Sequence, residues 1–281
     1  MICISAYPTR NKVIPNISKA VIESATDKTK LIANFGAGTD HIALNSAKKN
    51  EIIVTNTPGL LAEDTADLVL ALILALPRRL YEGSKVVAEG KWNGWSPTKM
   101  LGRRINGKRL GIIGMGRIGQ AIAKRAKVFG ISIHYHNRNQ LHSVIEEPLE
   151  ATYWSHLDEM IKRMDIISIN CPLNHETKGL MSKKRFNLMM PNSYIINSSR
   201  SELIDEEALN CMLKNNKIAG AGLDVFSRER GKNLELLNAP NTILIPHMGS
   251  ATVEGRIEMG EKVIINIKTY IDGHNPPNRI I

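Results

Sequence analysis

Three side chains of complementary chemistry follow the ends of predicted β-strands in the second half of the chain. The segment "SYIINSSR" ends in Arg200, "GAGLDVFSRE" ends in Glu229, and "NTILIPH" ends in His247. An arginine fork binds a carboxylate and polarises a neighbouring carbonyl. A histidine donates a proton near neutral pH, and a nearby glutamate favours its charged form. These residue types suit an enzyme that reduces a carbonyl group next to a carboxylate.

Each of the three residues also has an ordinary structural interpretation. Arg200 would be a surface arginine, Glu229 a loop carboxylate between Arg228 and Arg230, and His247 a hydrogen-bonded core histidine. Their order on successive strand ends favours a site, because ligands of open α/β sheets bind beyond the carboxyl ends of the strands. The segment "CPLNHET", after the strand "DIISIN", is expected at the same carboxyl ends.

The most specific local motif is "GIIGMGRIG", in which Gly114, Gly116 and Gly119 form G-x-G-x-x-G between an apolar strand and a helix. In such a motif the first glycine allows a tight turn, the second lets a pyrophosphate approach the backbone, and the third lets helix and strand pack closely. The helix N-terminus faces the anion. The motif therefore predicts a dinucleotide site.

Cofactor specificity is expected at the end of the next strand, "IHYHNR", where Asn137 lies 18 residues after Gly119. An acid at this position accepts hydrogen bonds from the ribose 2′-hydroxyl of NAD and would repel a 2′-phosphate. This chain has Asn137 and Arg138 instead, which can donate to a phosphate. We therefore expect NADP(H) to be preferred, with NAD(H) possible. The alternative is that Arg138 points into solvent and Asn137 caps a turn.

Apolar β-type runs alternate with helical periodicity along the chain, from "KLIANF" and "EIIVTN" through "RLGIIG", "ISIHYH" and "DIISIN" to "SYIIN", "IAGAGLDV" and "NTILIP". This alternation predicts an α/β fold with a doubly wound parallel sheet. A last helix is expected over about Thr252–Asp272. Its apolar stripe, for which we expect a role in core or domain packing, consists of Val253, Ile257, Gly260, Ile264, Ile267 and Ile271.

Composition narrows the class of protein. With 281 residues, 43% apolar content and 23% charge, the chain is long enough for one large core or two domains. The longest apolar run, "LVLALILAL", is shorter than the roughly 18 residues needed to cross a bilayer. We expect no membrane span, no secretory signal and a cytoplasmic location.

Charge and cysteine content exclude further classes. The formal charge of +10 is spread without a basic run, so we expect a solvated surface that attracts small anions, and no nucleic-acid partner. Cys3, Cys171 and Cys211 are too far apart for a disulfide framework or a zinc site. We therefore expect reduced thiols and no bound metal.

The sequence resembles the D-2-hydroxyacid dehydrogenases, and within them the bacterial glyoxylate/hydroxypyruvate reductases. The resemblance runs from about Cys3 to the C-terminus, through "NFGAGTDHI", "VTNTPGLLAEDTADLVLALI", "GWSPTKMLGRRINGKRLGIIGMGRIGQAIAKRAK", "NSSRSELIDEEAL", "AGAGLDVF" and "PHMGSATVEGR". It implies a Rossmann-type nucleotide domain, a smaller flavodoxin-like substrate domain, and reduction of a small 2-oxo acid.

The resemblance also assigns roles to individual residues. Arg200, Glu229 and His247, separated by 29 and 18 residues, correspond to the family's catalytic trio. His247 would protonate the carbonyl oxygen while Arg200 binds the substrate carboxylate, together with the amides of Ala37 and Gly38. Asp224 matches the position that contacts the nicotinamide carboxamide. The other implied cofactor contacts are Gly114, Gly116, Arg117, Ile118, Gly119, Asn137, Arg138, Cys171, Pro172, Thr177, Ser198, Ser199, His247 and Gly249.

Two features depart from the family pattern. The usual Glu-Pro after the catalytic glutamate reads "ERGKN", so the loop carrying Glu229 would be held differently. The segment before "ICISAYPTR" is short by roughly one βαβ unit of ~30 residues. We therefore expect a shortened and labile substrate domain formed by residues 1–57, a dinucleotide-binding domain over 58–248, and a C-terminal helix over 249–281 that returns to the first domain.

Other functions remain open at this point. The C-terminal-binding transcriptional corepressors resemble these dehydrogenases and use the fold as a dinucleotide-responsive binding module. Formate and phosphoglycerate dehydrogenases are alternatives within the enzyme class. The predicted helix 61–76 and the segment "GWSPTKML", with Trp95, resemble the family's dimer-forming region and favour a homodimer.

Overall fold

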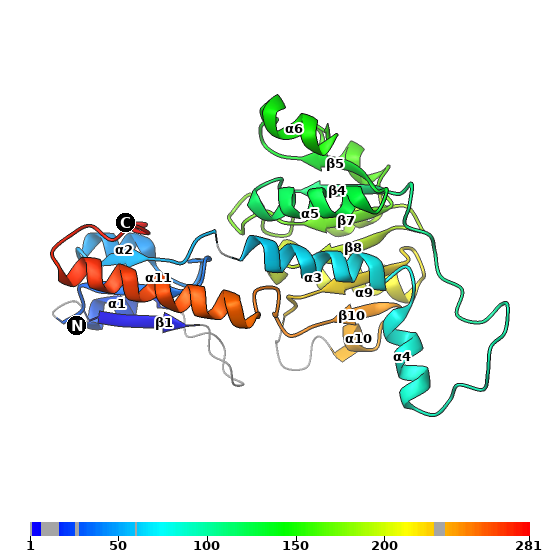
Figure 1. Ribbon diagram of the computed structural model, residues 1–281, viewed down its shortest axis with the longest axis horizontal. Coiled ribbons are helices and arrows are strands. Elements are labelled where there is room, and N and C mark those ends of the chain that lie inside the picture. The colour runs from blue at the N-terminus through cyan, green and yellow to red at the C-terminus, as the bar shows by residue number, and fades with distance from the viewer. Residues whose placement is uncertain (1, 7–16, 26–27, 60, 228–233) are drawn as a thin grey trace. The chain divides into compact units, whose positions relative to one another are not determined.

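The structure, a computed structural model, describes residues 2–6, 17–25, 28–59, 61–227 and 234–281 (Figure 1). Contacts group residues 1–61 with 250–281 in one compact unit and residues 62–249 in a second. The sequence placed these boundaries at 57/58 and 248/249. Local contacts explain the offset: Lys262 Nζ donates to Pro58 O at 2.8 Å, and Gly249 N donates to Asp224.

The smaller unit is built on a parallel sheet in which the described strands have the order β1 (Ile2–Ala6), β2 (Leu31–Phe35) and β3 (Ile53–Thr55). Its helices are α1 (Lys19–Ala25), α2 (Leu44–Lys49) and α11 (Val253–Ile271). Because β2 is the middle strand, all of its first four residues are buried. A small apolar core gathers around it, made of Ile22, Ile32, Ile42, Ala47, Ile52 and Val54.

Helix α11 begins and ends where the sequence predicts, but a different face is buried. Thr252 caps it by accepting a hydrogen bond from Gly255 N at 2.9 Å. Its buried residues are Gly255, Met259, Val263 and Asn266. The expected apolar stripe is wrong as a core face, because Val253, Ile257, Ile264 and Ile271 are between 53% and 72% exposed. The helix instead packs the side that carries Asn266, which donates to Asn56 O and accepts from Asn278 N.

The larger unit contains a parallel sheet whose described strands have the order β10-β9-β8-β7-β4-β5-β6. They are β4 (Arg109–Ile113), β5 (Ser132–His136), β6 (Thr152–Tyr153), β7 (Ile166–Ile169), β8 (Tyr194–Asn197), β9 (Gly220–Leu223) and β10 (Thr242–Leu244). The predicted α/β class with a doubly wound parallel sheet is confirmed.

Helices connect these strands. They are α3 (Ala62–Ala75), α4 (Leu80–Ala88), α5 (Arg117–Val128), α6 (Ser143–Leu149), α7 (Leu157–Ile161), α8 (Lys183–Phe186), the 3₁₀ turn η1 (Ser201–Leu203), α9 (Glu206–Lys214) and α10 (Leu234–Leu237). None of the helices in the described residues is long and apolar enough to span a bilayer.

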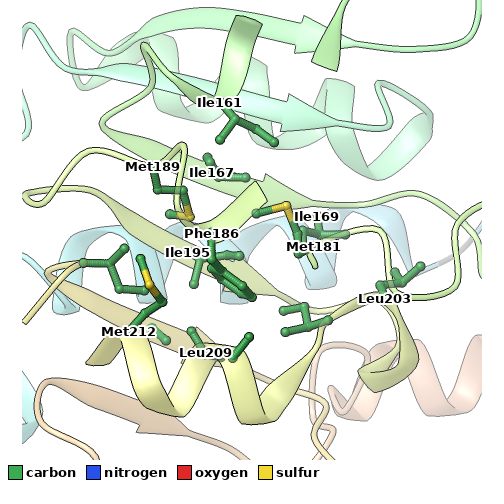
Figure 2. Close-up of a cluster of buried hydrophobic side chains, with 14 of the residues drawn as sticks. Ile161, Ile167, Ile169, Met181, Phe186, Met189, Ile195, Leu203, Leu209 and Met212 are labelled. Carbon is green, nitrogen blue, oxygen red and sulfur yellow. The ribbon is translucent and has the colours of Figure 1, made fainter. Parts of the chain in front are cut away.

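Both faces of the large sheet are covered, because alternate strand residues enter different cores. In β8, Ile195 belongs to one cluster and Tyr194 and Ile196 to the other. Figure 2 shows the first cluster, where side chains of β7 and β8 meet those of α9 around Phe186. This burial on two sides gives the carboxyl ends of the strands a rigid base from which to present polar residues.

Candidate active site and dinucleotide site

The chain order of the large sheet reverses beside β4, since β5 and β6 lie on one side of it and β7 to β10 on the other. Such a reversal opens a ligand crevice beyond the carboxyl ends of the two strands at the switch. The loops after β4 and β7 meet there, since Asn170 N donates to Ile113 O at 2.8 Å. The loop after β4 also contacts the end of β5, where Gly114 N donates to His136 O at 3.0 Å. The glycine-rich motif therefore lies at the switch point.

The three glycines of the motif have different surroundings. Gly114 has φ +96°, and a Cβ there would lie 2.7 Å from Cys171 N. A Cβ on Gly119 would overlap Gly114 O, so this glycine lets α5 pack on the turn. A Cβ on Gly116 would meet nothing within 4 Å. Gly114 and Gly119 are thus required by the close packing of the turn, whereas Gly116 borders open space that suits a bound pyrophosphate.

Helix α5 begins directly after Gly116, which supplies no capping side chain, and its first turn carries no acid. The amides of this turn therefore present the positive end of the helix dipole toward the loop. Gly116 and Arg117 are exposed, and Ile118 is partly buried. The residues present here match the requirements of a dinucleotide phosphate.

Asn137 is attached to the glycine-rich loop. Its Oδ1 accepts a hydrogen bond from Met115 N at 2.8 Å. Because only the oxygen can accept this bond, Nδ2 is directed away from Met115 and remains a donor. Within the described residues, neither Nδ2 nor the exposed Arg138 guanidinium has a hydrogen-bond partner. Gln120 Nε2 donates to Met115 O at 3.2 Å, so side chains hold both polar groups of the Met115 backbone.

The loop after β7 is held by its own side chains. Thr177 Oγ1 donates to Pro172 O at 2.7 Å and accepts from Asn174 N at 2.8 Å. Cys171 packs against the sheet core, and burial raises the pKa of its thiol to about 11. The loop therefore presents a protonated thiol and a backbone ordered by Thr177 beside the glycine turn.

Arg200 follows β8 by three residues. Asn197, which is fully buried, donates through Nδ2 to Arg200 O at 2.7 Å and accepts from Ser199 N at 3.0 Å. Ser199 Oγ donates to Ile169 O at 3.0 Å and joins this loop to the end of β7. Arg200 and Ser198 are both partly buried. The backbone that carries the arginine is thus fixed by a buried amide.

His247, like Arg200, lies beyond the carboxyl ends of the parallel strands. Asn197 of β8 pairs with Leu223 of β9, which pairs with Leu244 of β10, and His247 follows β10 by three residues. His247 is exposed and has φ +50°. The structure therefore brings the loops of two of the three predicted catalytic residues to the carboxyl ends of β8 and β10, on either side of β9.

The loop of His247 is attached to Asp224, which directly follows β9 and is 1% exposed. Met248 N donates to Asp224 Oδ1 at 2.6 Å, and Gly249 N donates to Oδ2 at 2.8 Å. The third predicted catalytic residue, Glu229, lies outside the described residues.

In the smaller unit, the turn after β2 contains Ala37 and Gly38. Its carbonyl groups are occupied: Asn34 Nδ2 donates to Gly36 O at 2.9 Å and to Gly38 O at 3.0 Å, and Asn56 Nδ2 donates to Ala37 O at 2.8 Å. In the part of the chain that the structure describes, nothing accepts from the amides of Ala37 and Gly38. The turn thus offers amide donors, as a carboxylate site requires.

Several supporting residues were missed from the sequence, namely Asn34, Asn56, Gln120 and Asn197. All are amides without charge, and only their proximity to glycine-rich or strand-end segments signalled a role. No group of three metal-ligating side chains gathers among the described residues.

The amino-acid sequence is similar to those of known proteins. The family model of the D-isomer specific 2-hydroxyacid dehydrogenase NAD-binding domain matches residues 70–249. A glyoxylate reductase of Thermococcus litoralis is 44% identical over 272 residues, which cover 95% of this chain and 81% of that protein.

Solved structures are similar as well. A glyoxylate reductase from Paecilomyes thermophila superposes with a TM-score of 0.89 at 33% identity, over 99% of this chain and 83% of that one. An acyclic imino acid reductase, solved with NADPH and D-Arg, gives a TM-score of 0.86 at 29% identity, over 100% and 84%.

Proposed function

Because the chain belongs to the D-isomer specific 2-hydroxyacid dehydrogenase family, whose members are oxidoreductases with a nicotinamide dinucleotide, we propose that it reduces a small 2-oxo acid with NADPH. Glyoxylate and hydroxypyruvate are the proposed substrates. One observation supports this most strongly: the loops of Arg200 and His247 follow β8 and β10, the two strands that flank β9, in a sheet whose switch point holds the glycine-rich loop.

In the proposed mechanism, the guanidinium of Arg200 binds the substrate carboxylate and polarises the 2-oxo group. The amides of Ala37 and Gly38 are proposed as further donors to a carboxylate. Bound NADPH would supply the hydride to the carbonyl carbon. His247, kept cationic and oriented by Glu229, protonates the carbonyl oxygen as negative charge develops on it.

The preference for NADPH is supported by the end of β5. No acid follows that strand directly, and the bond from Met115 N orients Asn137 so that Nδ2 remains a donor. Arg138 supplies a cation beside it, so the pair presents charge-assisted donors to a 2′-phosphate. The imino acid reductase solved with NADPH adds a precedent among similar structures.

The proposal is tested with initial rates for a panel of 2-oxo acids and both cofactors. We expect glyoxylate and hydroxypyruvate to give a higher kcat/KM than pyruvate or branched 2-oxo acids, and NADPH to exceed NADH. A comparable value for a branched acid would contradict the substrate assignment. Tight dinucleotide binding without turnover of any 2-oxo acid would favour the corepressor-like alternative.

We also propose a homodimer. Helix α4 contains no buried residue, and the segment after it exposes Trp92, Trp95 and Leu101 by 64%, 85% and 65%. Exposed apolar surface of this kind suits an interface with a second copy. Sedimentation at micromolar concentration should give a dimer, and Trp95→Ser with Leu101→Ser should weaken it. A monomeric wild-type protein would refute this proposal.

A further inference from the structure

We propose that Asp224 is the positioning residue that holds the loop of His247 in its catalytic conformation. This inference rests on the proposed function of His247 as the proton donor. It assigns Asp224 a role that acts through the protein, in addition to the cofactor contact that the family resemblance implies. The observation behind it is that three successive amides donate to this one residue.

The three hydrogen bonds form a compact clamp. His247 N donates to the main-chain Asp224 O at 2.9 Å, Met248 N to Oδ1 at 2.6 Å, and Gly249 N to Oδ2 at 2.8 Å. Asp224 N in turn donates to Asn197 O at 2.9 Å. The residue is therefore fixed to β8 on one side and orders the loop after β10 on the other.

Burial makes this clamp strong. Asp224 is 1% exposed, and a buried carboxylate is stable only where hydrogen bonds compensate its lost hydration. Bonds from amides to an ionised carboxylate are shorter and stronger than neutral ones. Since each carboxylate oxygen accepts one backbone amide, loss of either bond leaves a donor without its partner.

The loop conformation needs such support. His247 has φ +50°, in the left-handed region that a residue with a side chain rarely adopts. Strained backbone of this kind persists where surrounding contacts over-determine it. The turn directs residue 247 outward, where it is exposed, while Gly249 stays buried.

Gly249 fits closely against the clamp. A Cβ at this position would lie 2.8 Å from Asp224 Oδ2 and 3.4 Å from Thr65 Cγ2. Thr65 lies on α3 and is buried, so the added carbon has little room to move. Gly249→Ala should therefore disturb the same hydrogen bonds without altering the carboxylate itself.

The direct test is amide hydrogen exchange across residues 247–249 in the wild-type protein. If the clamp is formed, these amides should exchange about 10²-fold more slowly than an unstructured loop, although His247 is exposed. Exchange at the unstructured rate would overturn the proposal. This measurement needs no substrate and no variant.

Asp224→Asn is the matching substitution, because its Nδ2 would face a backbone donor. We expect faster exchange at 247–249 and a loss of kcat on the order of 10²-fold, the usual effect of a small misplacement of a reacting group. Because the family resemblance also places Asp224 at the nicotinamide, the Kd for NADPH, measured by nicotinamide fluorescence, should rise as well, and the exchange at 247–249 is the readout that decides the proposal. Gly249→Ala should give the same pattern.

Asp165→Asn is the control. Asp165 also accepts a hydrogen bond from a backbone amide, Arg109 N, at 2.9 Å, but it lies before β7, at the amino ends of the strands. Asp165→Asn should lower the melting temperature and leave kcat nearly unchanged. If Asp224→Asn instead raised the Kd for NADPH and left the exchange unchanged, Asp224 would be only a cofactor ligand. Wild-type protein that reduced no 2-oxo acid would refute the proposed function, while the exchange result would still decide whether the clamp exists.

Discussion

The structure separates two roles at the end of β5 that the sequence presents as one. Arg138 would act only on a 2′-phosphate, whereas Asn137 also orders the glycine-rich loop through Met115 N. Arg138→Ala should therefore weaken NADPH alone. Asn137→Ala should weaken NADPH and NADH together, since both cofactors use the same loop for their pyrophosphate.

The magnitudes follow from the contacts. A charge-assisted hydrogen bond contributes about 1.5–3 kcal/mol, or roughly 10- to 150-fold in affinity. Arg138 is exposed to solvent, which weakens charged contacts, so we expect at most about tenfold for Arg138→Ala with NADPH and no more than about twofold with NADH. Loss of the bond to Met115 N should cost about 1 kcal/mol, or roughly fivefold, with each cofactor.

Asn137→Asp separates the roles further. The carboxylate keeps an acceptor for Met115 N but adds a charge that repels a 2′-phosphate and accepts from a 2′-hydroxyl. Combined with Arg138→Ala, it should reverse the preference, mainly by raising the KM for NADPH.

The assay is kcat/KM with each cofactor at saturating 2-oxo acid, together with Kd from nicotinamide fluorescence. Arg104→Ala, which removes an exposed arginine on the segment before β4, is the control for net charge. Equal losses for both cofactors in Arg138→Ala would refute the reasoning. So would an Asn137→Ala variant that affected NADPH alone, or a wild-type protein that used NADH as well as NADPH.

Four further outcomes are expected. Gly119→Ala, whose Cβ would overlap Gly114 O, should lower the melting temperature, whereas Gly116→Ala should keep it and lose dinucleotide affinity; equal melting temperatures would contradict this. His247→Ala should lower kcat by about 10²–10⁴-fold with nearly unchanged cofactor Kd, and more than about a tenth of wild-type kcat at neutral pH would exclude it as the general acid. Asn34→Ala should raise the KM for the 2-oxo acid by releasing the turn at Ala37, with cofactor Kd as the control. At pH 8 the Cys171 thiol, with its pKa near 11, should react with iodoacetamide about 10²-fold more slowly than a free cysteine peptide, and rapid labelling would show that the thiol is not buried.

The elements with strong local signals were predictable from the sequence. The glycine-rich turn between β4 and α5 depends on backbone freedom and apolar periodicity, which are properties of adjacent residues. The ends of α11 were also predictable, because Thr252 is a capping residue at the start of the helical pattern.

The buried face of α11 was not predictable in the same way. Val253 and Ile257 form part of an apolar stripe, yet the helix buries the side that carries Met259, Val263 and Asn266. Periodicity identifies faces of a helix but not which of them meets a neighbour. That depends on partners far away in the chain, here Asn56 and the backbone of Asn278.

The candidate site likewise has features that the sequence indicated and features that only the structure shows. The sequence alone indicated Arg200, His247 and Asn137, because residue type and position after a strand express their chemistry. It could not show that Asn137 binds Met115 N, that Asn34 occupies the carbonyls of the turn at Gly38, or that Asp224 collects three amides from a loop 23 to 25 residues later. Apart from the Asn34 bond, which lies within one turn, those hydrogen bonds join segments that only the parallel sheet brings together. The tertiary structure therefore decides which polar atoms are already used and which remain for a ligand.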